Sequence, residues 1–246
     1  MSVLIYIDSE NGKVKKSAFE VATYARAIAD KQQTKVVAVT INVPQPEVLA
    51  AYGVNKVLSI TNDQLQHISA NTLNHLLQQA VAKESSTIVV FSASSQAKEV
   101  APLLANSLQV GYVSNVISLP TEDFIVKSNV FSNKAISLSQ INTPIKILGL
   151  APNAFKTEEK NVELTVEPFA PTLPDSNWGI QVITTEKTSG KVSLDDATIV
   201  VSGGRGLKAA ENWQIVEGLA EVLGAATACS CLLYTSPSPR DGLLSR

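Results

Sequence analysis

The sequence predicts an α/β protein: a parallel-sheet N-terminal domain with added hairpin strands, followed by the beginning of a second α/β domain. Three observations predict this class. Short apolar, β-branched runs alternate with helical patterns in the first 110 residues, further strand-like runs then follow with only short turns, and a glycine-rich turn near residue 204 joins a strand to a helix. Near-continuous apolar strands separated by helices are typical of a parallel sheet covered on both faces.

Four strands and four helical segments are expected in the first half of the chain. The strands are expected at 3–8, 35–41, 55–60 and 87–92, where apolar and β-branched residues dominate. Ser17 and Glu20 have the spacing of a capping box and predict a helix start. Further helical segments are expected at 46–53, 62–83 and through 100–108, because apolar residues recur there at helical spacing or lie between Pro and Gly.

The pattern changes after Gly111. Runs at 113–119, 123–128, 134–139 and 145–150 predict hairpin or edge strands of the same sheet, and 162–168 predicts one more strand. A proline-rich stretch then leads to 184–196, which lacks apolar periodicity. We therefore expect an N-terminal scaffold and interface domain at 1–185, a linker at 186–196, and a second domain that starts with a strand at 197–202.

Composition and charge exclude several classes of protein. Of the 246 residues, 45% are hydrophobic and 17% are charged, against about 25% charged in an average protein, which excludes global disorder. Twenty basic and 22 acidic residues give a net charge of −2, too balanced for a protein that neutralises nucleic-acid phosphates. No apolar run approaches the ~20 residues of a membrane span. The opening MSVLIYIDSENGK lacks the features of a targeting signal, so a cytoplasmic, bacterial-type protein is expected.

The most informative motif is the turn in ATIVVSGGRGLKAAENW. Gly204, Arg205, Gly206 and Ala209 fit the pattern G-x-G-x-x-A between a strand and a helix, which predicts a Rossmann-like, dinucleotide-binding domain. Glycines let the backbone approach a diphosphate, and the guanidinium of Arg205 suits phosphate or a polarised ring. A plain loop that needs glycine only for its geometry remains an alternative. An NAD(P)-dependent oxidoreductase is a second alternative, although no acidic residue follows Glu221 at the next strand end to hold the ribose.

The same residues resemble a known family. VVSGGRGLKAAENWQIVEGLAEVLGAATACS resembles the segment that opens the flavin domain in the α subunit of electron-transfer flavoproteins, and SGGRG followed by E-N is its specific part. The resemblance extends more diffusely over residues 1–230. Where that family commonly has Tyr-Ala-Gly-Asn-Ala, this chain has Phe131-Ser132-Asn133-Lys134-Ala135.

The resemblance implies an electron carrier with bound FAD and no substrate turnover of its own. Arg205 takes the place of the family's flavin-contacting arginine and Ser230 that of a serine that also touches FAD, while Gly204 and Gly206 shape the turn. The resemblance further implies a heterodimer with a β subunit, flavin dehydrogenases such as acyl-CoA dehydrogenases as donors, and a quinone oxidoreductase leading to the respiratory chain as acceptor. No catalytic residue and no metal site are expected.

The last sixteen residues, CLLYTSPSPRDGLLSR at 231–246, follow neither a helical nor an alternating pattern. They resemble adapter read-through and are expected to be a non-native tail, with a natural flexible terminus as the alternative. In that case the FAD-binding domain would be incomplete, with only 197–230 present. Fewer than ~40 residues seldom build a core, so this truncated chain is expected not to hold FAD.

Overall fold

The computed structural model describes residues 1–10, 12–174, 183–184, 194, 197, 199–207 and 210–229. The chain divides into two units, Met1–Ile183 and Thr184–Arg246, each of which is described by itself. Of the linker expected at 186–196 only Leu194 is described, and the tail at 231–246 lies outside the described residues.

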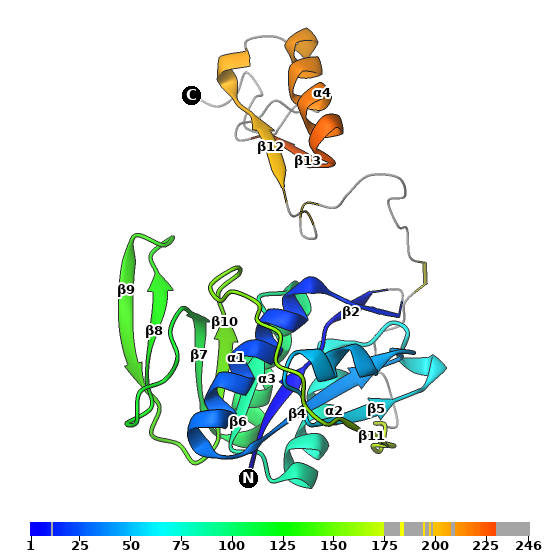
Figure 1. The fold of residues 1–246 in the computed structure, drawn as a ribbon, viewed down its shortest axis with the longest axis vertical. Helices are drawn as coiled ribbons and strands as arrows, with labels where there is room; N and C mark the ends of the chain where they lie inside the picture. Colours follow the sequence, from blue (N-terminus) through cyan, green and yellow to red (C-terminus); the bar gives the residue numbers. More distant parts are fainter. Residues whose placement is uncertain are drawn as a thin grey trace. The chain divides into compact units, whose positions relative to one another are not determined.

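The first unit is built on one nine-stranded sheet with the order β11-β5-β4-β1-β6-β10-β7-β8-β9 (Figure 1). The strands from β11 to β7 are parallel, whereas β8 and β9 are antiparallel additions at one edge. The strands are β1 (Ser2–Tyr6), β4 (Lys35–Ile41), β5 (Lys56–Ile60), β6 (Ile88–Phe91), β7 (Gly111–Val116), β8 (Ile125–Val130), β9 (Ala135–Gln140), β10 (Lys146–Leu150) and β11 (Thr165–Pro168). A separate two-stranded ribbon joins β2 (Ser9–Glu10) to β3 (Lys13–Val14).

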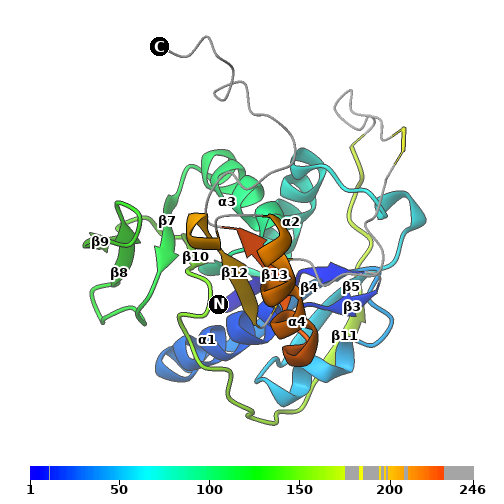
Figure 2. The same cartoon turned by 90° about the horizontal axis from the view of Figure 1, so that it is seen from above.

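Helices cover both faces of this sheet, as the near-continuous apolar strands predict. Helix α1 (Lys16–Gln32) packs on one face, and α2 (Ala70–Glu84) and α3 (Ser95–Leu108) pack on the other (Figure 2). Strand residues therefore alternate between two buried clusters, with Ile5 in the first and Leu4 in the second. Short 3₁₀ turns η1 (Pro46–Ala51) and η2 (Asp63–Leu65) complete the unit. Within the described residues no helix has the length and apolar character to cross a bilayer.

The structure confirms the α/β class but corrects the place of one strand. The run at 145–150 was expected among the hairpin or edge strands. Instead β10 lies inside the sheet, parallel to both β6 and β7. The physical reason is that four of its five residues, from Ile147 to Leu150, are buried, which an edge position does not provide. The strand expected at 162–168 forms β11 at the opposite edge, beside β5.

Two helix starts also differ from expectation. The capping box of Ser17 and Glu20 is not formed: α1 has no side-chain cap, and the carboxylate of Glu20 accepts a hydrogen bond from the amide of Phe155 at 2.9 Å. The helix expected over 62–83 begins only at Ala70. Ser69 caps it there by accepting from the amide of Thr72, while residues 63–65 form η2.

The turn between β8 and β9 contains three successive left-handed residues, Phe131, Ser132 and Asn133, with φ of 53°, 52° and 62°. Non-glycine residues adopt this conformation at a steric cost, which is largest for bulky side chains such as Phe131. The departure from the family's Tyr-Ala-Gly-Asn-Ala thus falls on positions where the backbone favours glycine.

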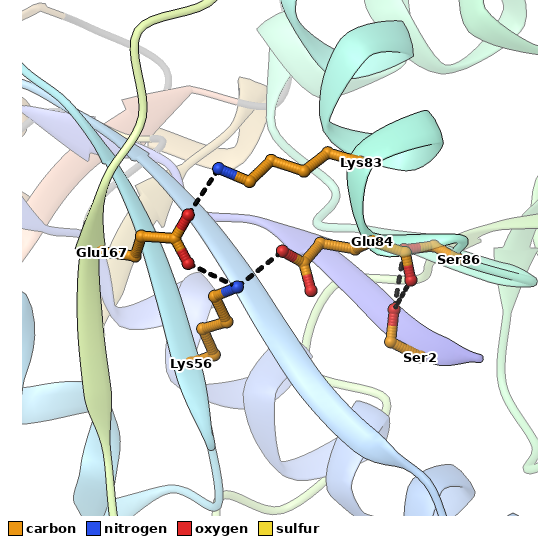
Figure 3. Close-up of polar contacts among 6 residues, drawn as sticks. All are labelled: Ser2, Lys56, Lys83, Glu84, Ser86 and Glu167. Atoms are coloured by element: carbon orange, nitrogen blue, oxygen red, sulfur yellow. Dashed lines mark hydrogen bonds and ion pairs between the residues drawn. The ribbon is translucent and has the colours of Figure 1, made fainter.

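An ion-pair network fastens the edge strand β11 (Figure 3). The carboxylate of Glu167 contacts Lys56 Nζ of β5 at 2.6 Å and Lys83 Nζ of α2 at 2.5 Å, and Lys56 also contacts Glu84 at 2.8 Å. Hydrogen bonds from Lys56 and Lys83 lower the pKa of Glu167 to about 2. Because the strand pairs with the sheet on one side only, this network supplies a second attachment to the layer of helices.

We predict that Glu167→Gln lowers the melting temperature of the protein at pH 7. The carboxylate has a depressed pKa in the folded state, so its stabilisation is present above its ordinary pKa of 4.5 and is lost as the pH falls towards 2. The difference in melting temperature between the wild type and the variant should therefore shrink over this range. Glu163→Gln, which removes the same charge from an exposed neighbour, is the control. A difference independent of pH would contradict the role of the ion pairs.

Candidate functional site

The glycine-rich turn lies in a strand–helix–strand unit of the second part of the chain. β12 (Val200–Gly203) leads through the 3₁₀ turns η3 (Arg205–Leu207) and η4 (Ala210–Asn212) into α4 (Trp213–Leu223), and the chain returns in β13 (Ala226–Cys229). The two strands are parallel, with Gly203 opposite Cys229. The turn thus leaves the carboxyl end of a parallel strand, which is where α/β proteins bind nucleotide ligands.

Gly203, the last residue of β12, is required for the packing of α4 on the strand. A Cβ atom at this position would lie 2.4 Å from Leu207 Cδ1, 2.8 Å from Trp213 Cζ3 and 3.1 Å from Val216 Cγ2. A larger residue at this position would force the side chains of Leu207 and Trp213 to move. The motif analysis missed this residue, although the adjacent glycines and the tryptophan of the following helix gave a signal.

Gly204 and Gly206 occupy a different environment. The carbonyl of Gly204 accepts a hydrogen bond from the amide of Leu207 at 3.0 Å, which closes the first turn. A Cβ atom on Gly206 would have no atom of the described residues within 4 Å. The packing of the protein therefore does not require a glycine at position 206. The space beside Gly206 is open to a ligand.

A side-chain hydrogen bond of Asn212 connects the turn to the start of α4. Its Nδ2 donates to the carbonyl of Leu207 at 2.7 Å, so the side chain ties the end of η3 to the start of α4. The asparagine belongs to the E-N pair that the sequence resemblance singles out, but its hydrogen bond could not be read from the motif.

The predicted site residues are only partly brought together. The backbone places Gly204 directly after β12 and Arg205 and Gly206 in η3. Ser230 follows β13 in the sequence but lies outside the described residues, as does Ala209. The amides at the start of the turn and the open space at Gly206 fit the diphosphate part of a dinucleotide.

The sheet of the first unit has a comparable position of its own. β1 is followed by β4 and β5 on one side, whereas β6 lies on its other side, so the strand order reverses between β1 and β6. At the carboxyl ends of these two strands lie Asp8 and Ser92, both only 4% exposed. This position is filled by the protein's own buried side chains.

Fold and turn together define a two-part α/β protein with a dinucleotide-type turn in its second part. Comparison with known families agrees: the electron transfer flavoprotein domain matches residues 3–173, and the electron transfer flavoprotein FAD-binding domain matches residues 193–236. The chain belongs to the electron transfer flavoprotein family, as the resemblance of its sequence implies.

Its relatives are named as α subunits of these proteins. The chain is 28% identical over 233 residues to the electron transfer flavoprotein subunit alpha of Bacillus subtilis (strain 168), and covers 71% of that protein with 93% of its own length. It is 26% identical over 242 residues to the subunit of the same name from Megasphaera elsdenii, covering 71% of it with 92% of its own length. The mitochondrial subunit of Oryza sativa subsp. indica is also 26% identical over 242 residues, of which 68% is covered by 94% of this chain.

The family fixes the general role of the protein. It is an electron carrier with FAD as its cofactor and is not an enzyme that turns over a substrate of its own. The alternative of an NAD(P)-dependent oxidoreductase finds no support in these comparisons.

The contrast between the two glycines gives a prediction about stability. Gly203→Ala should destabilise the second unit by about 1–3 kcal/mol, the usual cost of overpacking, because its Cβ meets Leu207 and Trp213. Gly206→Ala should leave the unit unchanged. Limited proteolysis with mass spectrometry checks this: cleavage within 197–229 should accelerate only in the Gly203 variant. Equal protection of both variants would show that α4 does not pack tightly on β12.

Proposed function

We propose that the turn formed by Gly204, Arg205 and Gly206 holds the FAD of this electron carrier. The observation that supports the proposal is the open space at Gly206 beside a turn at the carboxyl end of β12. FAD supplies the capacity to take up and release electrons. The chain supplies a backbone that a diphosphate can approach closely.

Arg205 is proposed as the cation of the site. Its guanidinium either grips the diphosphate through paired donors or lies beside the flavin ring, where a positive charge favours negative charge on the ring. Ser230 is proposed as a second contact with FAD. Gly203 and Cys229 lie opposite each other in parallel register, so the segments that follow them leave the sheet at the same edge.

A division of labour between the two parts of the chain follows. We propose that residues 1–185 form the scaffold and the interface with a β subunit, that 186–196 link the two parts, and that 197–230 contribute to the FAD-binding domain. The name of the relatives, subunit alpha, supports a heterodimer. Flavin dehydrogenases such as acyl-CoA dehydrogenases are proposed as donors, and a quinone oxidoreductase of the respiratory chain as acceptor.

The test is to isolate the gene product from its own organism through an affinity tag at the N-terminus. We expect a yellow complex with a second chain, the β subunit, and close to one FAD per heterodimer, measured by flavin absorbance and by release of the cofactor. A colourless product would overturn the proposal.

We further predict that the 246-residue chain, produced alone and mixed with its β subunit and excess FAD, retains far less than one FAD after desalting. In the described part of the second unit, α4 exposes apolar side chains to water: Ile215 is 69%, Leu219 51% and Val222 84% exposed. Such a surface is not a closed core, and cofactor retention needs one. Stoichiometric flavin absorbance in this sample would contradict the prediction.

Substitution of Arg205 tests its role in the tagged complex from the organism. Arg205→Gln should weaken FAD retention about tenfold or more, because a hydrogen bond to a charged group contributes about 1.5–3 kcal/mol. Arg205→Lys keeps the charge but loses the planar fork of donors, so it should fall between the glutamine variant and the wild type. The readout is the FAD dissociation constant from fluorescence titration. Unchanged affinity in both variants would remove Arg205 from the site.

A further inference from the structure

A short segment follows the last strand of the first unit and holds the chain against α2. β11 stops at Pro168, and the chain continues through residues 169–173, the strap, before it leaves the described part of this unit at Pro174. The next element that the structure describes is β12 of the second unit, which begins at Val200. The strap is therefore the point at which the connection between the two units begins.

A proline ends the backbone pairing at the start of the strap. The amides of Thr165 and Phe169 donate to the carbonyls of Asn55 and Ser59, at 3.0 and 2.8 Å. Amides of alternate residues in a strand point to the same side, so the next donor in this row belongs to position 171. Because that position is Pro171, which has no amide hydrogen, the ladder along β5 stops at Phe169.

A glutamine of α2 then holds the strap as a neighbouring strand would hold it. Gln79 Nε2 donates to the carbonyl of Thr172 at 2.9 Å, and Gln79 Oε1 accepts from the amide of the same residue at 2.8 Å. A glutamine amide carries both a donor and an acceptor, so one side chain satisfies both backbone groups of Thr172. The position of the strap backbone thus depends on a single residue of α2.

The two ends of the strap carry its apolar contacts. The side chains of Phe169 and Leu173 are partly buried and pack against the core cluster on the α2 and α3 side of the sheet. Lys83 Nζ lies 4.9 Å from the centre of the Phe169 ring. The middle of the strap, in contrast, is exposed at Ala170 and Thr172.

The strap is able to open while β11 stays in place. Because Thr172 is exposed, water competes for the two hydrogen bonds that hold it. Segments with few buried contacts and exposed hydrogen bonds open locally at a small part of the free energy of global unfolding. β11 has separate attachments, through its pairing with β5 and the ion pairs of Glu167 with Lys56 and Lys83 (Figure 3).

We propose that the strap is a conformational device that sets the length of the connection between the two units. When Gln79 holds Thr172, the connection starts after Leu173. When Gln79 releases Thr172, up to five residues join the connection, which adds about 16–18 Å of reach for an extended chain. In an electron carrier this reach determines how far the cofactor travels between a donor and an acceptor. Only this last step rests on the proposed function, which assigns FAD to the second unit.

Hydrogen exchange measured by mass spectrometry tests the attachment in the full chain. Gln79→Ala removes both hydrogen bonds to Thr172 and introduces a residue that favours a helix. Gln78→Ala is the matched control, since it makes the same change one position away on α2. We expect amide exchange in peptides that cover the strap to accelerate about tenfold or more in Gln79→Ala, because two hydrogen bonds are lost, and to stay unchanged in Gln78→Ala.

Distances between two spin labels test the effect on reach. The labels are attached at exposed positions of the two units, through Lys98→Cys on α3 and Glu217→Cys on α4, in a chain whose own two cysteines are changed to serine. Pulsed electron paramagnetic resonance should give a distance distribution whose upper end moves outwards in Gln79→Ala by up to about 18 Å. The mean should move less, because the added residues are not fully extended. Gln78→Ala should match the parent chain.

Thermal unfolding identifies the variants that fold, and Phe169→Ala, which weakens the other end of the strap, decides if Gln79→Ala does not. The proposal is wrong if strap exchange does not accelerate, if Gln78→Ala accelerates it as much, or if exchange accelerates while the distances stay the same. Neither measurement involves flavin, so this test fails or succeeds separately from that of the flavin site.

Discussion

The absence of a side chain at Gly203 is the constraint on which the candidate site depends. Because Gly203 has no side chain, Leu207 and Trp213 pack closely against the end of β12. The pairing of Gly203 with Cys229 then brings the second strand of the unit to the same edge. The motif thus combines a buried glycine, Gly203, that packs against the following helix with an open one, Gly206.

The two units show two uses of one architecture. Each has parallel strands that end beside the start of a helix, and in α/β proteins this is where phosphates bind. In the first unit the place is taken by Asp8, which is hydrogen-bonded to Ser92 and Ser94, and the sheet is extended by β8 and β9. In the second, the glycines keep it open. In the function that we propose, the same fold therefore provides a scaffold in one part of the chain and a cofactor turn in the other.

Much of this arrangement could be predicted from the sequence, because the strands of the first unit are apolar on both faces and the glycine turn has a recognisable spacing. The place of β10 could not, since a buried strand has the same pattern anywhere inside a sheet and its neighbours come from distant segments. Glu20 shows a similar limit: its partner is the amide of Phe155, 135 residues away. At the site, Gly203 and Gly206 are both glycines of one motif and differ in the atoms around them.

The insertion of β10 between β6 and β7 also bears on how the protein is made. β7, β8 and β9 are synthesised first, yet β7 has no place beside β6 until residues 146–150 have left the ribosome. Until then the nascent chain exposes the unpaired backbone groups at the edge of β6, and a strand from another chain can pair with them. Such late pairing over a long sequence distance slows folding. The central pairing of the sheet is thus completed only after residue 150 has emerged, and until then the open edge of β6 is a surface that a chaperone can protect.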